Sequence, residues 1–233
     1  MRTSEARDGG AKGATLKHDL EVVVDSDVLA RRGATLVGLW ARKAVKDHGQ
    51  FTFAVSGGRT PWAMFKELVY EDMPWEQTVI YQVDERVAPD GDPDRNLTHL
   101  KASLGTAPAR VEPMPVLDAD LEAAAAAYAK TLPESFDLIH LGLGPDGHTA
   151  SLVPNDPVLD VTDKLVGLTQ PYQGHPRMTL TYPALARAEQ LLWLVSGDDK
   201  HDPLARLLAG ETGIPAGRVE AGHSFILADE SAA

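Results

Sequence analysis

The sequence predicts an α/β fold in which a mainly parallel sheet lies between two layers of helices. Short apolar runs of strand length alternate with longer stretches of helical spacing, and no repeat or low-complexity linker interrupts them. The chain has 233 residues, which favours one large domain. We expect that domain over 15–233. The Gly-rich segment 1–14 lacks the apolar core of a secretory signal and is expected to be a flexible tail.

The first strand is expected over 20–24, followed by a helix that ends near Gly49. Ser26 is the predicted N-cap of this helix, since its hydroxyl can accept an N–H of the first turn, and Gly suits the left-handed end. The helix should pack on the sheet through an apolar face made up of Leu29, Gly33, Leu36, Val37, Trp40 and Ala44.

The rest of the chain repeats the order of strand, loop and helix. Apolar runs predict further strands over 51–55, 78–83, 136–143, 164–168, 177–181, 190–196 and 224–227. Amphipathic or Ala-rich stretches predict helices over 62–70, 97–104, 120–132, 183–187 and 199–208. Ligands of open parallel sheets bind outside the carboxyl ends of the strands, so the polar loops after these strands are expected to form one site.

A Gly-rich loop, Ser56-Gly57-Gly58-Arg59-Thr60-Pro61, joins the strand over 51–55 to the next helix. Its glycines let the backbone approach a ligand, and the helix start offers free N–H groups. Ser56 and Thr60 add hydroxyls and Arg59 adds a charge, so the loop favours a phosphate, although its spacing is neither a Walker loop nor a dinucleotide fingerprint. The alternative is a tight turn whose glycines serve packing and whose threonine caps the helix.

A second loop places His148 among glycines directly after a predicted buried strand. An imidazole titrates near neutral pH and suits general-base work, and Asp146 could orient the ring. The alternative is a histidine that only hydrogen-bonds its loop. The other histidines lack such a setting and are expected at surface or packing positions: His18, His48, His99, His140, His175, His201 and His223.

The charge balance limits the partners of this chain. Its 22 Lys and Arg against 34 Asp and Glu give a formal net charge of −12, which disfavours nucleic acid and anionic lipid. No apolar run approaches the ~18 residues of a membrane span. The absence of Cys excludes disulfides and thiol nucleophiles and fits a cytoplasmic location. No side-chain spacing typical of a metal site occurs, so no metal is expected.

An anionic ligand in so acidic a chain requires local cations. Arg86, Arg177 and Lys200 each lie near a predicted strand end and are candidates to hold a phosphate. Each of them alone could equally be a solvated or salt-bridged residue. Asp84 and Glu85 could orient Arg86 or a substrate hydroxyl, or simply end a strand.

Four segments together resemble a known family. They are Phe53 to Pro61, Asp84-Glu85-Arg86 with Asn96 downstream, the string from Gly142 to Leu152, and Arg177-Met178-Thr179-Leu180-Thr181. The chain is similar to the glucosamine-6-phosphate isomerase and 6-phosphogluconolactonase family, most specifically through Gly144-Pro145-Asp146-Gly147-His148-Thr149-Ala150-Ser151. The resemblance implies a three-layer, Rossmann-like fold and a metal-free, cofactor-free hydrolase that opens 6-phosphoglucono-δ-lactone.

The predicted site combines the two loops with the nearby charged residues. His148 and Asp146 form the expected catalytic pair. Substrate or phosphate contacts are expected at Ser56, Gly57, Gly58, Arg59, Thr60, Asp84, Arg86, Gly144, Arg177 and Lys200. The expected partner is a small sugar-phosphate lactone, with no nucleic acid and no membrane, and the expected state is a monomer or weak homodimer.

Two alternatives remain open. An amino-sugar deaminase of the same family would carry a carboxylate where this chain has Ser151-Leu152-Val153-Pro154, which disfavours that reaction. A non-catalytic sugar-phosphate sensor would need a DNA-binding helix-turn-helix, and roughly 20 residues ahead of the first strand are too few to make one.

Overall fold

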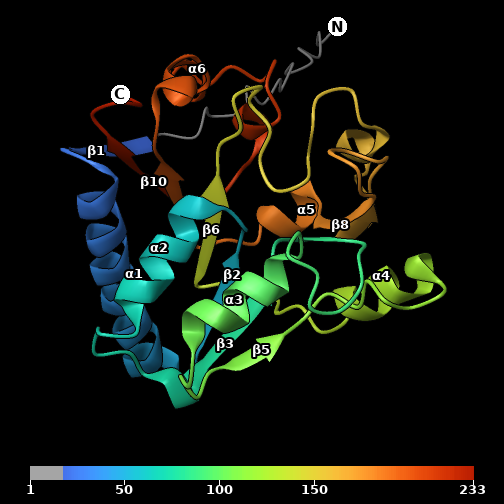
Figure 1. The fold of residues 1–233 in the computed structure, drawn as a ribbon, viewed down its shortest axis with the longest axis horizontal. Coiled ribbons are helices and arrows are strands. Elements are labelled where there is room, and N and C mark those ends of the chain that lie inside the picture. The colour runs from blue at the N-terminus through green and yellow to red at the C-terminus, as the bar shows by residue number, and fades with distance from the viewer. Residues whose placement is uncertain (1–17) are drawn as a thin grey trace, which may run out of the picture.

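A computed structural model describes residues 18–233, so the expected tail over 1–14 lies outside the described residues. Seven strands form one parallel sheet in the order β1-β10-β9-β6-β2-β3-β5 (Figure 1). The strands are β1 (His18–Val23), β2 (Phe51–Val55), β3 (Thr78–Gln82), β5 (Arg110–Glu112), β6 (Leu138–Gly142), β9 (Gln190–Val195) and β10 (His223–Asp229). The predicted α/β class with a mainly parallel sheet is confirmed.

Helices cover both faces of this sheet (Figure 1). One face packs against α1 (Ser26–His48), α2 (Arg59–Leu68) and α3 (Asn96–Leu104). The other packs against α4 (Leu121–Ala129), α5 (Tyr182–Leu185) and α6 (His201–Leu208). The three-layer arrangement expected from the sequence is therefore present.

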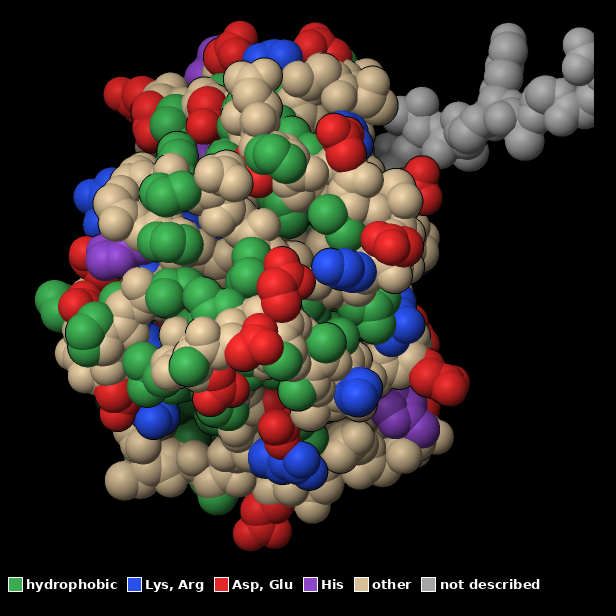
Figure 2. Space-filling view, turned by 90° about the vertical axis from the view of Figure 1, so that its right-hand side faces the viewer, with side chains coloured by type: hydrophobic (Ala, Val, Ile, Leu, Met, Phe, Trp, Pro, Cys, Tyr) green, Lys and Arg blue, Asp and Glu red, His purple; other side chains and the backbone are tan. Residues whose placement is uncertain are grey.

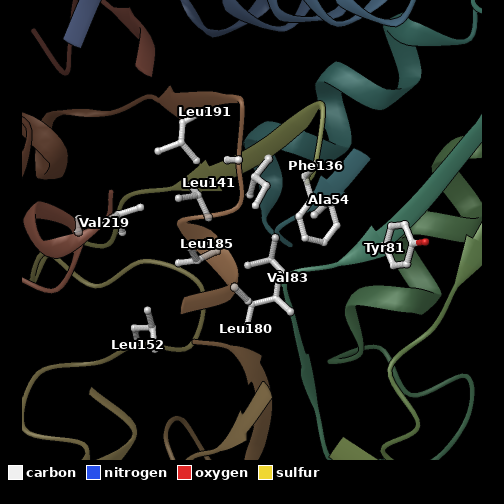
Figure 3. Packing of buried hydrophobic residues seen from close by; sticks show 14 of the residues in the cluster. Ala54, Tyr81, Val83, Phe136, Leu141, Leu152, Leu180, Leu185, Leu191 and Val219 are labelled. Atoms are coloured by element: carbon white, nitrogen blue, oxygen red, sulfur yellow. The ribbon is translucent and has the colours of Figure 1, made fainter. Parts of the chain in front are cut away.

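Alternate side chains of each central strand enter different cores. In β9, Leu191 and Trp193 join the cluster with α4 to α6, whereas Leu192 and Leu194 join the cluster with α1 to α3. All four are buried. Figure 3 shows part of the first cluster, with Leu191 close to side chains of other strands and helices. Burial on both faces explains why the central strands appear in the sequence as continuous apolar runs.

The helix ends follow from side-chain chemistry, with one correction to the prediction. Asp25, not Ser26, caps α1: its carboxylate accepts the Val28 N–H at 2.8 Å from an extended backbone. A carboxylate one position earlier competes well for this role, because it accepts strongly and suits the positive end of the helix dipole. Gly49 ends the helix in the left-handed conformation, with φ of 88°, as expected.

A second, antiparallel sheet was not predicted. It contains β4 (Asp84–Arg86), β8 (Arg177–Leu180) and β7 (Val166–Leu168), in the order β4-β8-β7. The segments of β7 and β8 were predicted as strands, but Asp84-Glu85-Arg86 was expected only as the polar end of the strand over 78–83, and β5 was missed. Three residues are too few for a period-2 pattern to stand out, so neither strand leaves a clear signal in the sequence.

The sheet order fixes where a ligand can bind. From β2 the chain continues to β3 and β5 on one side, whereas from β6 it continues to β9 and β10 on the other. The neighbouring strands β2 and β6 thus flank the point where the strand order reverses, and the crevice at their carboxyl ends is the usual ligand site of such sheets. The two loops singled out from the sequence follow these two strands.

The surface agrees with the acidic composition. On the face shown in Figure 2, acidic side chains are interspersed with basic ones, and no broad basic area is visible. Within residues 18–233, no helix has the length and hydrophobicity needed to cross a membrane.

Candidate active site

A cleft of about 240 Å³ opens at the carboxyl ends of β2, β6 and β9. Eight of the predicted site residues line it: Ser56, Gly57, Gly58, Arg59, Thr60, Gly144, His148 and Lys200. The structure therefore brings together the Gly-rich loop, the histidine loop and the lysine, which are far apart in the sequence. Ser196 and Asp199 also line the cleft and were not expected there.

The Gly-rich loop leads into a helix whose first turn is open. Gly58 precedes α2 with φ of 135°, a conformation that suits glycine, and no side chain caps the helix. The first N–H groups of a helix have no intrahelical partner and attract anions. Gly58 to Pro61 line the cleft, so the uncapped start of α2 lies where an anion could bind.

Asn96 supports this loop from behind, a role that was not predicted. A Cβ on Gly57 would lie 1.9 Å from the Asn96 Oδ1, so only glycine fits against that side chain. Asn96 is buried. It donates to the Asp84 carbonyl at 2.9 Å and accepts from Arg86 Nη1 at 2.8 Å. Its place in the family resemblance was the only sequence signal that could have pointed to it.

Glu85, left ambiguous by the sequence, is a buried helix cap. Its carboxylate accepts the Asn96 N–H at 2.7 Å and the Leu97 N–H at 2.8 Å, which are the first two amides of α3. A negative charge at this end also complements the helix dipole. Glu85 therefore fixes the start of α3 and, with it, the position of Asn96 behind the Gly-rich loop.

His148 and Asp146 form a close pair. The His148 Nδ1 lies 2.5 Å from an Asp146 carboxylate oxygen, which also accepts the His148 backbone N–H at 3.1 Å. Since the carboxylate only accepts, Nδ1 carries the proton of the neutral ring, and Nε2 keeps a free lone pair. Burial acts to raise the pKa of Asp146, but the hydrogen bonds and charge of His148 outweigh it and lower this pKa. The carboxylate is thus ionised at neutral pH.

The predicted residues Asp84, Arg86 and Arg177 do not line the cleft. The Asp84 carboxylate accepts from Ser151 Oγ at 2.6 Å and from Asn96 Nδ2 at 3.2 Å. Arg177 is buried, its Nη1 lies 3.4 Å from Ser151 Oγ, and burial lowers its pKa. Asp84, Asn96, Ser151 and Arg177 thus form a buried polar network that connects β4, the start of α3, the segment after His148 and β8, and the half-buried Arg86 joins it through Asn96. The contact of Asp84, Arg86 and Arg177 with a substrate remains a prediction.

Tyr172 lies between this network and the pair of His148 and Asp146. The Arg177 guanidinium lies 5.0 Å from the centre of the Tyr172 ring, and that ring meets the His148 ring edge to face at 5.6 Å. Contacts of both kinds contribute modestly to stability. Tyr172 therefore packs the His148 ring on the side of Arg177, a role for which the sequence carried no signal.

His140 is a buried packing residue, one of the two roles allowed for it. It lies on β6 with no exposed surface, and its Nδ1 accepts the Ser56 N–H at 3.4 Å while its carbonyl accepts Ser56 Oγ at 3.2 Å. Within the described chain its Nε2 has no partner. Burial lowers the pKa of His140 to about 3, so the ring stays neutral across the physiological range.

His140 is expected to make the fold sensitive to acid. An unfolded chain protonates this ring below about pH 6.5, whereas the folded protein resists protonation down to about pH 3. The free energy of unfolding should therefore fall with decreasing pH in this window, by up to about 1.4 kcal/mol per pH unit from this group. Urea unfolding at pH 7.5, 6 and 5 measures the slope. His140→Leu should flatten it, and an equal slope in the variant would contradict the assignment.

The comparisons with known proteins agree with one another. A model of the family described as glucosamine-6-phosphate isomerases/6-phosphogluconolactonase matches residues 24–227. A 6-phosphogluconolactonase from Synechocystis sp. is 34% identical over 206 residues, which cover 82% of this chain and 85% of the relative. The crystal structure of 6-phosphogluconolactonase from Thermotoga maritima superposes with a TM-score of 0.83 at 25% identity, covering 92% of this chain and 100% of that one.

A solved structure of a different enzyme shares the fold. A monomeric glucosamine-6-phosphate deaminase superposes with a TM-score of 0.80 at 16% identity, covering 92% of this chain and 98% of that one. At that identity the likeness shows the fold alone, so the reaction has to be argued from the site.

Proposed function

The chain belongs to the family of glucosamine-6-phosphate isomerases and 6-phosphogluconolactonases, and we propose that it is the lactonase, which hydrolyses 6-phosphoglucono-1,5-lactone to 6-phosphogluconate in the oxidative pentose phosphate pathway. The observation that carries the proposal is the cleft itself. Its walls hold a His148 ring oriented by a carboxylate and, facing the same space, an uncapped helix start beside Lys200. A base and an anion site in one cleft are what a phosphorylated lactone requires.

The phosphate binds first and positions the lactone. It docks on the open first turn of α2, within reach of Lys200, while Arg59 adds positive charge at the rim. Binding energy from this non-reacting group holds C1 of the lactone at a fixed place relative to His148. The phosphate site therefore contributes to the rate as well as to affinity.

His148 then acts as a general base and a general acid. Its Nε2 takes a proton from a water molecule as the water oxygen bonds to C1, forming a tetrahedral oxyanion. The oxyanion collapses with cleavage of the bond from C1 to the ring oxygen, which receives the proton from the imidazolium. Asp146, ionised and bonded to Nδ1, stabilises the positive ring in between. The step needs only water as co-reactant, and we expect neither metal nor cofactor.

The environment of Ser151 argues against the amino-sugar alternative. In the related deaminases an acidic residue after the Asp-Gly-His string is expected to partner the histidine, and here that stretch holds Ser151, which is buried and donates to Asp84 at 2.6 Å. A buried serine with this partner supplies no base for ring opening. For the sensor alternative, the segment that would have to hold a helix-turn-helix falls within 1–17, outside the described residues.

A direct assay tests the proposal. Freshly generated 6-phosphogluconolactone is followed with and without the protein, in the presence of a chelator, and the spontaneous rate is subtracted. We expect enzyme-dependent loss of the lactone that survives chelation. Glucosamine 6-phosphate is assayed in parallel for ammonia release. Release of ammonia without lactone hydrolysis would overturn the assignment.

Lys200→Ala is expected to separate phosphate recognition from chemistry. Removing this cation should raise KM for 6-phosphogluconolactone by about 10- to 100-fold, which corresponds to the free energy of one hydrogen bond between charged groups. The change in kcat should be smaller. Unphosphorylated gluconolactone serves as the control substrate and should be turned over almost equally by both proteins. Equal KM effects on the two substrates would place the phosphate elsewhere.

Arg177→Ala examines the buried network in the same assay. We expect it to weaken the preference for the phosphorylated lactone, because a cation near the cleft favours a dianion even without contact.

We also propose a cytoplasmic location and a state of assembly for the protein. A chain without cysteine fits the cytoplasm, and we expect a monomer or weak homodimer in sedimentation experiments.

A further inference from the structure

The proposed phosphate site contains a carboxylate. Among the described residues, Asp199 is the one acidic residue that lines the cleft. The cations Arg59 and Lys200 line the same cleft. A negative charge beside a site for a dianion weakens binding unless it has another purpose. The position of Asp199 therefore calls for a physical explanation.

Asp199 forms an ion pair with Lys200, the cation that is proposed to bind the phosphate. Its Oδ2 lies 2.8 Å from the Lys200 Nζ, and the Lys200 side chain is only 18% exposed, so the ammonium is partly withdrawn from water. The hydrogen bond from Lys200 lowers the pKa of Asp199, and the charge of Arg59 acts in the same direction. The carboxylate is therefore ionised at neutral pH and fully available as a partner for Lys200.

A phosphorylated ligand has to compete with this pair. When its phosphate reaches Lys200, Asp199 must either leave the ammonium or remain within a few ångströms of the dianion, and each costs binding energy. The carboxylate is itself 60% exposed and carried by the short segment Asp198–Lys200, so it is free to turn into water. The cost is therefore moderate and does not abolish binding.

Resting on the function proposed above, we propose that Asp199 is an internal counter-ion that competes with the phosphate of substrate and product for Lys200 and sets a weak affinity for both. The competition continues after the reaction, because the product keeps the phosphate on ring opening. Weak ground-state binding shortens the time for which the product blocks the cleft, and affinity in the ground state does not itself raise kcat.

Asp199→Asn tests the inference, with Asp198→Asn as the matched control. Asp198 is the preceding residue, is exposed and does not line the cleft. Both variants remove one charge from the same segment. We expect Asp199→Asn to bind 6-phosphogluconate about 3- to 10-fold more tightly than the wild type, by calorimetry and as a competitive inhibitor, and Asp198→Asn to differ by less than about twofold. The gain should shrink at high ionic strength.

A double-mutant cycle shows whether the competition is for Lys200. In the Lys200→Ala background, Asp199→Asn should lose its advantage over Asp198→Asn, because the contested cation is gone. Product affinity that is unchanged or lower in Asp199→Asn would overturn the inference. The lactone assay on the wild type decides the proposed function separately, since a wild type that hydrolyses the lactone while Asp199→Asn shows no gain refutes only the counter-ion role.

Discussion

His148→Ala is expected to lower kcat for 6-phosphogluconolactone by on the order of 10²- to 10⁴-fold, the usual range for loss of a general base, with a smaller change in KM. The reason is that the two nitrogens of the His148 ring have different roles. Asp146 accepts the Nδ1 proton, with 2.5 Å between Nδ1 and its carboxylate oxygen, so Nε2 is the one nitrogen that can take a proton from water. The phosphate site proposed on α2 and Lys200 is untouched, which is why binding should survive.

The control for this variant is another paired histidine. His48 lies 2.8 Å from Asp137 at the amino ends of β2 and β6, the edge of the sheet opposite to the cleft. His48→Ala should therefore leave kcat almost unchanged while it removes a comparable hydrogen-bonded pair of histidine and aspartate. Initial rates, corrected for spontaneous hydrolysis, measure both. Near-normal turnover in His148→Ala would remove His148 from its catalytic role.

Much of the fold was predictable because its strands are buried on two faces. Runs such as 51–55 and 190–196 are long and apolar enough to predict strands, and the loops after β2 and β6 could be placed at one sheet edge from topology rules alone. The same rules brought His148 and the Gly-rich loop together. At these positions the apolar pattern of the strands and the polar residues of the following loops indicate the same site, and the prediction succeeds for that reason.

The buried network could not be predicted, because it depends on contacts between distant segments. Asp84 bonds to Ser151 and Asn96, which lie 67 and 12 residues away in the sequence. A polar side chain inside a protein looks in the sequence like one at the surface, and only the fold shows that its partners are at hand. The second sheet was missed for a related reason, since β4 is held by its pairing with β8 rather than by its own apolar pattern.

Gly144→Ala is expected to lower kcat on the order of 10²-fold, although it adds one methyl group and removes no functional atom. The Cβ of an alanine at this position would lie 2.1 Å from His148 Nδ1, much closer than atoms in contact can approach. The ring must therefore move, and the Nδ1 bond to Asp146 must lengthen or break. A misplacement of about 1 Å is enough for a loss of this size. The prediction therefore assigns Gly144 the role of leaving room for the His148 ring.

Gly142→Ala is the control that separates this steric effect from a general loss of glycine. Gly142 lines the same cleft two residues earlier, yet a Cβ there would meet no atom within 4 Å, and neither glycine has a left-handed backbone. Both variants should fold, so thermal unfolding should be similar while kcat falls only in Gly144→Ala. Equal activity in the two variants would mean that the ring has a second productive position, and the fixed geometry assigned to the pair of His148 and Asp146 would then be wrong.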